Sequence, residues 1–256
     1  MFTIAMVHET LVAGLLGTCL LAALLVAPAT ARAQDWTLYN ALLAEHVAPA
    51  EREGVSFHAV DYAAWANDPR YPQVLAQVES FPLEALETTA DKVAFYSNVY
   101  NLYAIRMVID NLPLASIRDA GSLFSPVWKK PVGRLGGRTV TLDEIEHQIL
   151  RPLGEARIHF AIVCASLSCP DLRREAFTVA QLEEQLEDQT RRFLDNASKG
   201  LRVEGTQVQV SRIFDWFEED FEAAGGVESF VRRYRELPPQ IRLRAAISYN
   251  WNLNAQ

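Results

Sequence analysis

The sequence has little of several features that would place it quickly in a class. It has three cysteines, 12 glycines and 12 prolines among 256 residues, which excludes a disulfide-dense mini-protein and a collagen-like or low-complexity chain. Acidic residues outnumber basic ones, 32 to 24, and the net charge is −8. Because nonspecific binding to nucleic acid needs a basic surface, we expect no nucleic-acid partner.

Long hydrophobic runs are also scarce, and the one that exists lies near the start of the chain. Residues 11–27 are almost entirely apolar, Pro28 ends the run, and Ala-Arg-Ala follows at 31–33. This pattern predicts a secretory signal peptide over residues 1–33, although no lysine or arginine precedes the apolar run. An uncleaved membrane anchor is the alternative. We therefore expect a periplasmic or secreted protein, residues 34–256, without a membrane segment after cleavage.

Hydrophobic periodicity along the rest of the chain predicts a mixture of helices and short hairpins. The expected helices cover residues 36–47, 62–65, 71–81, 91–111, 142–150, 178–194 and 227–237. The expected strands form hairpins over 132–140 and 201–210, and single strands over 157–164 and 246–253. Because no regular β-α-β alternation is present, the pattern indicates an α+β fold in a single globular domain, residues 34–256.

Capping-box patterns predict where two of the expected helices begin. Thr141 with Glu144, and Thr178 with Gln181, have the spacing of a capping box, in which each side chain bonds the other residue's backbone amide. The helix over 91–111 is apolar almost all round, which indicates that it is buried on nearly every side.

Two amides interrupt that buried helix. Asn98 and Asn101 lie three residues apart, so they share one helix face. Buried amides cost free energy unless their donors and acceptors are paired. They are therefore either satisfied core amides that pin neighbouring loops, or residues that line a polar pocket and donate to an oxyanion.

A hydroxyl-rich turn bounded by two cysteines is the first candidate for chemistry. Cys164 ends the expected strand over 157–164, and Cys169 follows after Ala-Ser-Leu-Ser. A thiol beside a histidine and a carboxylate is an activated nucleophile, because the histidine takes the thiol proton and the carboxylate orients the ring. Cys164 is the preferred nucleophile because the chain should emerge there into a pocket, and Cys169 is the alternative.

The matching base and carboxylate lie just upstream, on the helix expected over 142–150. His147 would be the base, and Glu146 would orient it. Adjacent helical residues diverge by about 100°, so the two side chains cannot point the same way. If Glu146 faces elsewhere, Asp143 or Glu144 would orient the imidazole instead.

Other residues in this part of the sequence have more ordinary interpretations. His159 is a rival base, but alternation along a strand would place it on the face opposite Cys164. Trp216 is expected in the core rather than in an aromatic platform for sugars. Asp215 and Asp220 are expected to be solvated or paired with Arg212.

Several stretches, in this order along the chain, match a known family. They are AFYSNVYN (94–101), LDEIEH (142–147) with LRP (150–152), IHFAIVCASLSCP (158–170), IFDW (213–216) with DF (220–221), and YNWNL (249–253). Through them the chain resembles the family called domain of unknown function 547 over about residues 88–254. Tyr96-Ser97 stands where that family usually has a tryptophan and an apolar residue. The resemblance is compatible with a thiol-hydrolase core of the papain and transglutaminase-like group, in permuted order because the histidine precedes the cysteine.

Two function classes are consistent with these observations. The first is a secreted or periplasmic cysteine hydrolase or acyl transferase that acts on an amide or thioester bond of a small or cell-wall peptide. The second is a non-catalytic envelope binding or structural domain in which Cys164 and Cys169 form a disulfide, which requires Cα atoms within about 7 Å. A metal site built from these cysteines with His147 and His159 is a third option. No nucleotide, haem or flavin motif is present, so we expect no cofactor and a small-molecule or peptide ligand.

Overall fold

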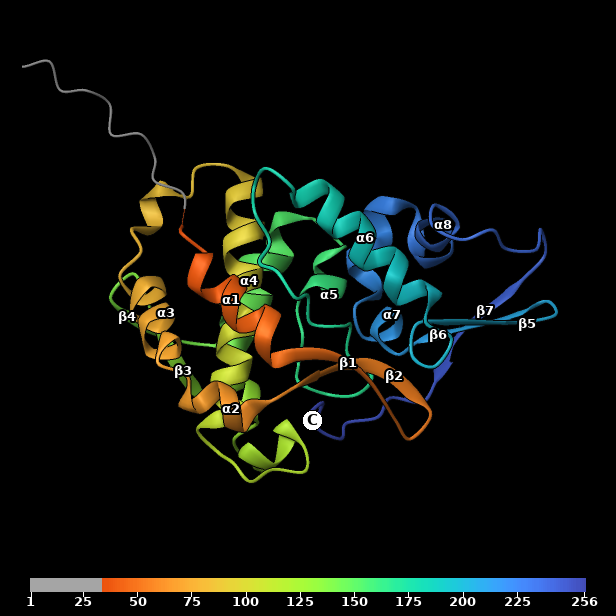
Figure 1. Cartoon of the computed structure of the whole chain (residues 1–256). Helices are drawn as coiled ribbons and strands as arrows, with labels where there is room; N and C mark the ends of the chain where they lie inside the picture. The colour runs from red at the N-terminus through yellow and green to blue at the C-terminus, as the bar shows by residue number, and fades with distance from the viewer. Residues whose placement is uncertain (1–33) are drawn as a thin grey trace, which may run out of the picture. The chain divides into compact units, whose positions relative to one another are not determined.

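The computed structural model describes residues 34–256, and the predicted signal peptide, residues 1–33, lies outside the described residues (Figure 1). The α+β prediction for a single domain is confirmed, since helices and three small sheets share one compact unit. No helix within 34–256 is both long and apolar enough to cross a membrane.

The helices and strands alternate irregularly along the chain. The α-helices are α1 (Thr37–His46), α2 (Tyr62–Asn67), α3 (Arg70–Glu79), α4 (Thr89–Ile109), α5 (Ile158–Ala161), α6 (Leu182–Asp195), α7 (Ile213–Trp216) and α8 (Gly226–Arg232). The strands are β1 (Val47–Arg52), β2 (Val55–Val60), β3 (Pro131–Leu135), β4 (Arg138–Thr141), β5 (Leu201–Glu204), β6 (Gln207–Ser211) and β7 (Arg242–Ile247). A π-helical segment, η4, covers Glu144–Leu150, and 3₁₀ turns include η2 (Ile117–Ala120), η3 (Val127–Lys129) and η6 (Glu218–Ala224).

Each sheet is small. The strand pairs β1–β2, β3–β4 and β5–β6 are antiparallel hairpins, and β7 adds to β6 in parallel. The two hairpins expected around 132–140 and 201–210 are confirmed. The β1–β2 hairpin was not predicted, and its turn contains Glu53 and Gly54, both with positive φ.

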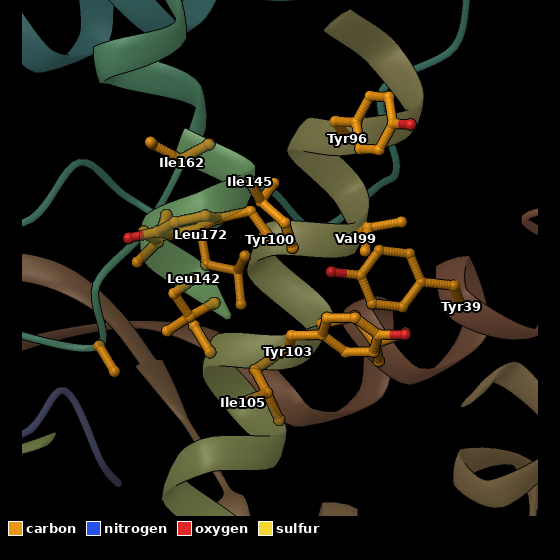
Figure 2. Close-up of a cluster of buried hydrophobic side chains, with 14 of the residues drawn as sticks. Tyr39, Tyr96, Val99, Tyr100, Tyr103, Ile105, Leu142, Ile145, Ile162 and Leu172 are labelled. Atoms are coloured by element: carbon orange, nitrogen blue, oxygen red, sulfur yellow. The ribbon is translucent and has the colours of Figure 1, made fainter. Parts of the chain in front are cut away.

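The helix expected over 91–111 is the centre of the larger core. It forms α4, where nearly every side chain from Val93 to Val108 is buried, as predicted. Figure 2 shows its tyrosines and aliphatic residues among side chains from other elements, such as Tyr39 of α1 and Ile145 of η4. A second apolar cluster joins α6, α7, α8 and the β5–β6–β7 sheet around Phe160.

One expected strand is in fact a helical turn. The residues expected as a strand over 157–164 begin with α5, in which the amide of Ile162 bonds the carbonyl of Ile158 at 3.0 Å. Only the end of that stretch is extended. A short run of apolar residues does not distinguish a buried strand from a buried helical turn, because both hide all their side chains.

Two other predicted boundaries are wrong. The last strand, β7, begins at Arg242 and overlaps the expected range 246–253 only at residues 246 and 247, and the chain after it is irregular. The second capping box does not form, because α6 begins later and the amide of Thr178 bonds the side chain of Gln185 at 2.9 Å. The first capping box is confirmed by reciprocal bonds of 2.9 and 3.1 Å between Thr141 and Glu144.

The C-terminal segment is held between distant parts of the chain. Its amides and carbonyls bond β2 at Val60, the cysteine turn at Leu167 and Ala165, and the loop at Ala115. Glu53, at the tip of the first hairpin, also accepts bonds from Asn250 and Asn252. These contacts fix Tyr249 and Trp251, which lie on either side of Asn250, beside the cysteine turn. Figure 1 shows the C-terminus close to the β1–β2 hairpin.

Candidate functional site

A small cavity brings the two cysteines together with polar groups from several elements. Its volume is about 80 Å³. Besides the cysteines, its polar lining consists of Tyr100 of α4, Glu146 of η4, His159 of α5 and Tyr249 of the C-terminal segment. We call it the cysteine cavity. Concave sites with a mostly apolar lining and a few convergent polar groups are typical of ligand and active sites.

The structure joins the two cysteines in a disulfide. Their sulfurs are bonded and their Cα atoms are 6.2 Å apart, within the range that a disulfide requires. Cys164 is half-buried and Cys169 is buried, so Cys164 is the more accessible of the two. The phenol oxygen of Tyr249 lies 3.2 Å from each sulfur. Oxidised sulfurs cannot attack a substrate, so any nucleophilic role requires reduction first.

The turn between the cysteines has an unusual backbone. Ala165 has a φ of +59°, a left-handed conformation that costs a residue with a Cβ roughly 1–2 kcal/mol. The turn is secured from outside, because Leu167 donates its amide to Asn252 at 2.9 Å and the hydroxyl of Ser168 accepts from Asn250 at 2.8 Å. A strained residue held in place by its surroundings is a recurring feature of functional sites.

His159 is the histidine that faces the cysteine cavity. Its Nε2 lies 2.6 Å from Oδ2 of Asp220, and its ring stacks on Phe217 with centroids 4.0 Å apart. Arg151 binds both oxygens of Asp220, at 2.7 and 3.0 Å. Within residues 34–256, Nδ1 of His159 has no hydrogen-bond partner. The ring is therefore oriented through one nitrogen and leaves the other available for a proton.

The electrostatics keep this pair in defined charge states. Burial lowers the pKa of His159, although the bond from Asp220 opposes that shift. For Asp220, burial raises the pKa, but the bonds from His159 and Arg151 outweigh it and hold the pKa well below its usual range. The imidazole is thus neutral at pH 7 and sits against a permanent carboxylate, which is the arrangement of a general base.

The expectation that His159 faces away from Cys164 is wrong. It assumed strand alternation, whereas α5 is helical, and both residues line the cysteine cavity. Asp220 lies 61 residues beyond its histidine partner. Of the two aspartates expected to be solvated or paired with Arg212, Asp215 does pair with it, at 2.8 Å, whereas Asp220 binds His159 and Arg151.

His147 is not placed as the expected base. Its Nδ1 is 3.2 Å from the guanidinium of Arg151, and its Nε2 is 3.9 Å from Asp143. In the described part of the chain, His147 is not among the residues that line the cysteine cavity. Glu144, the other proposed orienter, is committed to the helix cap at Thr141.

Glu146 points into the cysteine cavity, as expected if adjacent helical residues diverge. It is buried, and it accepts a hydrogen bond of 3.1 Å from the phenol of Tyr100. Burial raises its pKa to about 7, although the Tyr100 bond lowers it. Glu146 therefore does not orient His147, and near neutral pH it exchanges between a protonated and an ionised form.

Asn98 and Asn101 are satisfied core amides. Asn98 makes two 2.8 Å bonds with the backbone of Phe177. Asn101 donates to the carbonyl of Ala161 at 2.9 Å and accepts from the amide of Val163 at 2.8 Å. Neither lines the cysteine cavity within the described residues, so the alternative in which they donate to an oxyanion has no geometric support. Asn101 instead fixes the chain that carries both His159 and Cys164.

An aromatic wall completes the cysteine cavity and was not predicted. Trp128, Trp216 and Trp251 line it together with Phe217. Trp216 is 42% exposed, so it is not the core residue that was expected. Its ring stacks on that of Trp251, with centroids 5.7 Å apart and planes 26° from parallel.

The family model described as "Protein of unknown function, DUF547" matches residues 83–194. The chain resembles this family. The match covers the part of the chain that carries α4, Glu146, His159 and both cysteines, and it confirms the resemblance stated from the motifs. No curated protein and no solved structure matches the chain.

The cysteine–histidine metal set that the sequence suggested is not assembled in the cysteine cavity. The two sulfurs bond each other, and His147 lies outside the cavity lining among the described residues. Across residues 34–256, only Glu45, His46 and Asp68 approach closely enough to share an ion. Arg70 already pairs with Glu45 at 2.5 Å and Asp68 at 2.8 Å, so this cluster fits an ion-pair network rather than a metal centre.

Proposed function

We propose that this protein is a cysteine-dependent hydrolase or acyl transferase, exported to the periplasm or secreted, and active when the Cys164–Cys169 pair is reduced. The observation that carries the proposal is that one cavity contains the more accessible cysteine, Cys164, and a neutral histidine oriented by a partly buried carboxylate. The base is His159 and its orienter is Asp220, in place of His147 and Glu146. In chain order the histidine again precedes the cysteine, consistent with a permuted thiol-hydrolase core.

The proposed chemistry uses only side chains of this cavity. After a dithiol reduces the disulfide and is itself oxidised, Nδ1 of His159 takes the proton of the Cys164 thiol. The thiolate forms a bond to the carbonyl carbon of an amide or thioester, and the leaving amine or thiol departs with the proton from the imidazolium. Water, or an acyl acceptor, then cleaves the acyl-thioester and returns the thiol. No cofactor is required for any step.

The rest of the cavity supports charge development in this reaction. The Tyr249 phenol, 3.2 Å from either sulfur, is placed to donate to a developing oxyanion. Protonated Glu146 supplies a second donor at neutral pH. The small cavity volume, about 80 Å³, suits the acyl carbonyl and a small side chain rather than a folded protein, which favours small or cell-wall peptides as substrates.

The test measures turnover of peptidyl thioesters and amides by the protein without residues 1–33, before and after reduction. Reduced protein should be active and oxidised protein inactive. Cys164→Ser should abolish turnover. His159→Ala and Asp220→Asn should lower it by roughly 10²–10⁴-fold, whereas His147→Ala should stay near the unmodified rate. Unchanged activity in Cys164→Ser and Cys169→Ser would exclude thiol catalysis.

The disulfide itself favours a second candidate, a non-catalytic envelope binding or structural domain. In that case the Cys164–Cys169 bond rigidifies the turn beside the aromatic wall, and it is never reduced in use. Titration of free thiols in protein isolated without reductant separates the two. Full oxidation, together with no activity after reduction, would support the binding domain.

A further inference from the structure

A larger hollow, here called the outer groove, opens beside the cysteine cavity. It has a volume of about 880 Å³, and Trp128 and Trp251 line both hollows. The two indoles are therefore a shared wall, and a ligand whose reacting bond lies in the cysteine cavity would extend along it. Volumes of roughly 300–1,000 Å³ are usual for sites that hold small ligands and short peptides.

The apolar character of the shared wall suits an apolar side chain. The rings of Trp128 and Trp251 lie 6.1 Å apart, and both side chains are only partly buried. Leu123, at the rim of the outer groove, is 90% exposed. Partly exposed aromatic residues in a concave site gain free energy when a ligand covers them.

Arg118 supplies the charge in this groove. Its guanidinium carbon lies 5.2 Å from the ring centroid of Trp251, and the stacking orients the group at the wall. Within residues 34–256, Arg118 has no salt-bridge partner. The neighbouring carboxylate, Asp119, accepts the backbone amide of Ser116 at 2.9 Å. The outer groove therefore offers an oriented guanidinium that has no carboxylate partner of its own.

We propose that the outer groove binds peptides through a carboxylate on Arg118, with an apolar side chain against Trp128 and Trp251. A guanidinium recognises a carboxylate through paired, charge-assisted hydrogen bonds. The carboxylate is either the C-terminus of the peptide or an acidic side chain. The proposal rests on the proposed function, because it defines the substrates of the cysteine cavity as short apolar peptides that carry such a group.

Intrinsic tryptophan fluorescence tests binding without requiring turnover. Oxidised protein without residues 1–33 is titrated with three N-acetylated tripeptides of alanine and leucine. The first has a free C-terminal carboxylate, and the second has a C-terminal amide. The third has a C-terminal amide and a glutamate next to its leucine. We expect the free acid to bind roughly tenfold more tightly than the plain amide, the size of effect typical of a charged hydrogen bond. If the glutamate form gains as much, an acidic side chain suffices, and if it does not, the groove recognises the C-terminus.

Variants assign the effect to the groove. Arg118→Ala should remove the preference for the acid, Arg118→Lys should restore part of it, and Arg244→Ala, an exposed arginine on β7, should leave it unchanged. Equal affinity for acid and amide, no binding by any of the three forms, or a preference that survives in Arg118→Ala would overturn the proposal.

The same titration separates this proposal from the function of the cavity. Oxidised protein should bind the acid peptides although its bonded sulfurs cannot attack them, because binding requires no bond cleavage. If carboxylate-dependent binding is present, but the reduced protein hydrolyses no thioester or amide of the same peptides, the outer groove stands and the proposed hydrolase function fails.

Discussion

The pairing of His159 with Asp220 is the residue-scale feature on which the account of the site depends. The 2.6 Å contact uses Nε2, so the neutral ring carries its proton there and presents Nδ1 as a base. His147 has a comparable imidazole, but its nearest partners are the cation of Arg151 and a carboxylate at 3.9 Å. Burial lowers the pKa of both histidines, but within residues 34–256 no carboxylate lies within hydrogen-bond distance of His147 to orient its ring. His147 is therefore the poorer candidate for the base.

Glu146 should give the protein a pH-dependent stability that a glutamine removes. Burial raises its folded pKa to about 7 from 4.5, so the folded state binds its proton more tightly than the unfolded state does. Stability from this group is full below about pH 4.5 and is lost as pH rises through 7. Between about pH 4.5 and 7.5, the unmodified protein should lose about 3 kcal/mol of unfolding free energy from this group, and the Glu146→Gln variant should not lose it.

Urea unfolding at pH 4.5, 6 and 7.5 measures this difference. The groups that interact with Glu146, namely Tyr100, Arg151, Asp143 and Asp220, are present in both proteins, so most of their titration cancels. Glu184→Gln, at an exposed carboxylate, is the control and should show no gain that increases with pH. A constant offset between Glu146→Gln and the unmodified protein would show that the carboxyl group is ionised throughout.

Asn101→Leu should destabilise the protein by about 1–3 kcal/mol for each backbone group left unpaired. The substitution removes the partners of the Ala161 carbonyl and the Val163 amide, both in the interior. Differential scanning calorimetry measures the change. Asn67→Leu removes an exposed amide that bonds only its own helix, at Ala63, and should have a much smaller effect. Similar melting temperatures for both variants would mean that the hydrogen bonds of Asn101 do not hold the Ala161–Val163 segment in place.

At the residue scale, the sequence predicted several of the residues that line the cysteine cavity, but not all of their roles. Cys164, Cys169 and Glu146 were named in advance and do line the cavity. His147 was preferred as the base because strand alternation would turn His159 away from Cys164, whereas α5 is helical and the carboxylate that orients His159 comes from a distant turn. Trp216 was missed because a tryptophan among phenylalanines normally indicates core.

At the scale of elements, the capping box at Thr141 should matter more than the similar pattern at Thr178. Thr141→Ala removes a cap whose bonds are present, and it should cost about 1 kcal/mol. It should also speed amide exchange in η4, which carries Glu146. Thr178→Ala is the matched control, because its hydroxyl bonds Gln181 and caps no helix amide. Equal exchange in the two variants would contradict the assigned start of η4.

The contrast between α5 and the expected strand shows where local patterns stop being informative. Isoleucine and valine favour strands, and the run from Ile158 to Val163 is entirely compatible with one. The structure turns it into a helix because Asn101 binds both sides of the bend, at Ala161 and Val163. The decisive contact thus comes from α4, about 60 residues earlier in the chain. Local periodicity does not indicate a contact between residues that far apart.

At the scale of the whole molecule, the cavity is assembled from six separate parts of the chain. Side chains come from α4, η3, η4, the α5–cysteine turn, α7 with the residue after it, and the C-terminal segment. The family resemblance had selected almost the same stretches, but neither order nor spacing indicates which side chains meet. The longer helices, two hairpins and the buried centre were predictable, because they depend on hydrophobic periodicity, whereas the short helices α5 and α7 were not predicted. The site depends on long-range packing.

The predicted signal peptide should be cleaved when the full chain is exported. The apolar run and the Ala-Arg-Ala site predict mature protein that begins at Gln34. Expression of the full chain in a bacterium, followed by fractionation and intact-mass measurement, checks this. A mass that retains residues 11–27 would indicate a membrane anchor, and protein found only in the cytoplasm would contradict export.

The most direct test of the account is the rate at which each cysteine is alkylated by iodoacetamide after gentle reduction, measured by peptide mass spectrometry between pH 5 and 9. We expect Cys164 to react before Cys169. His159→Ala should slow Cys164 and shift its pH profile upward, because the thiolate loses its proton acceptor, while His147→Ala should leave the profile in place. Rates that depend on His147, or on neither histidine, would contradict the assignment of His159 as the base.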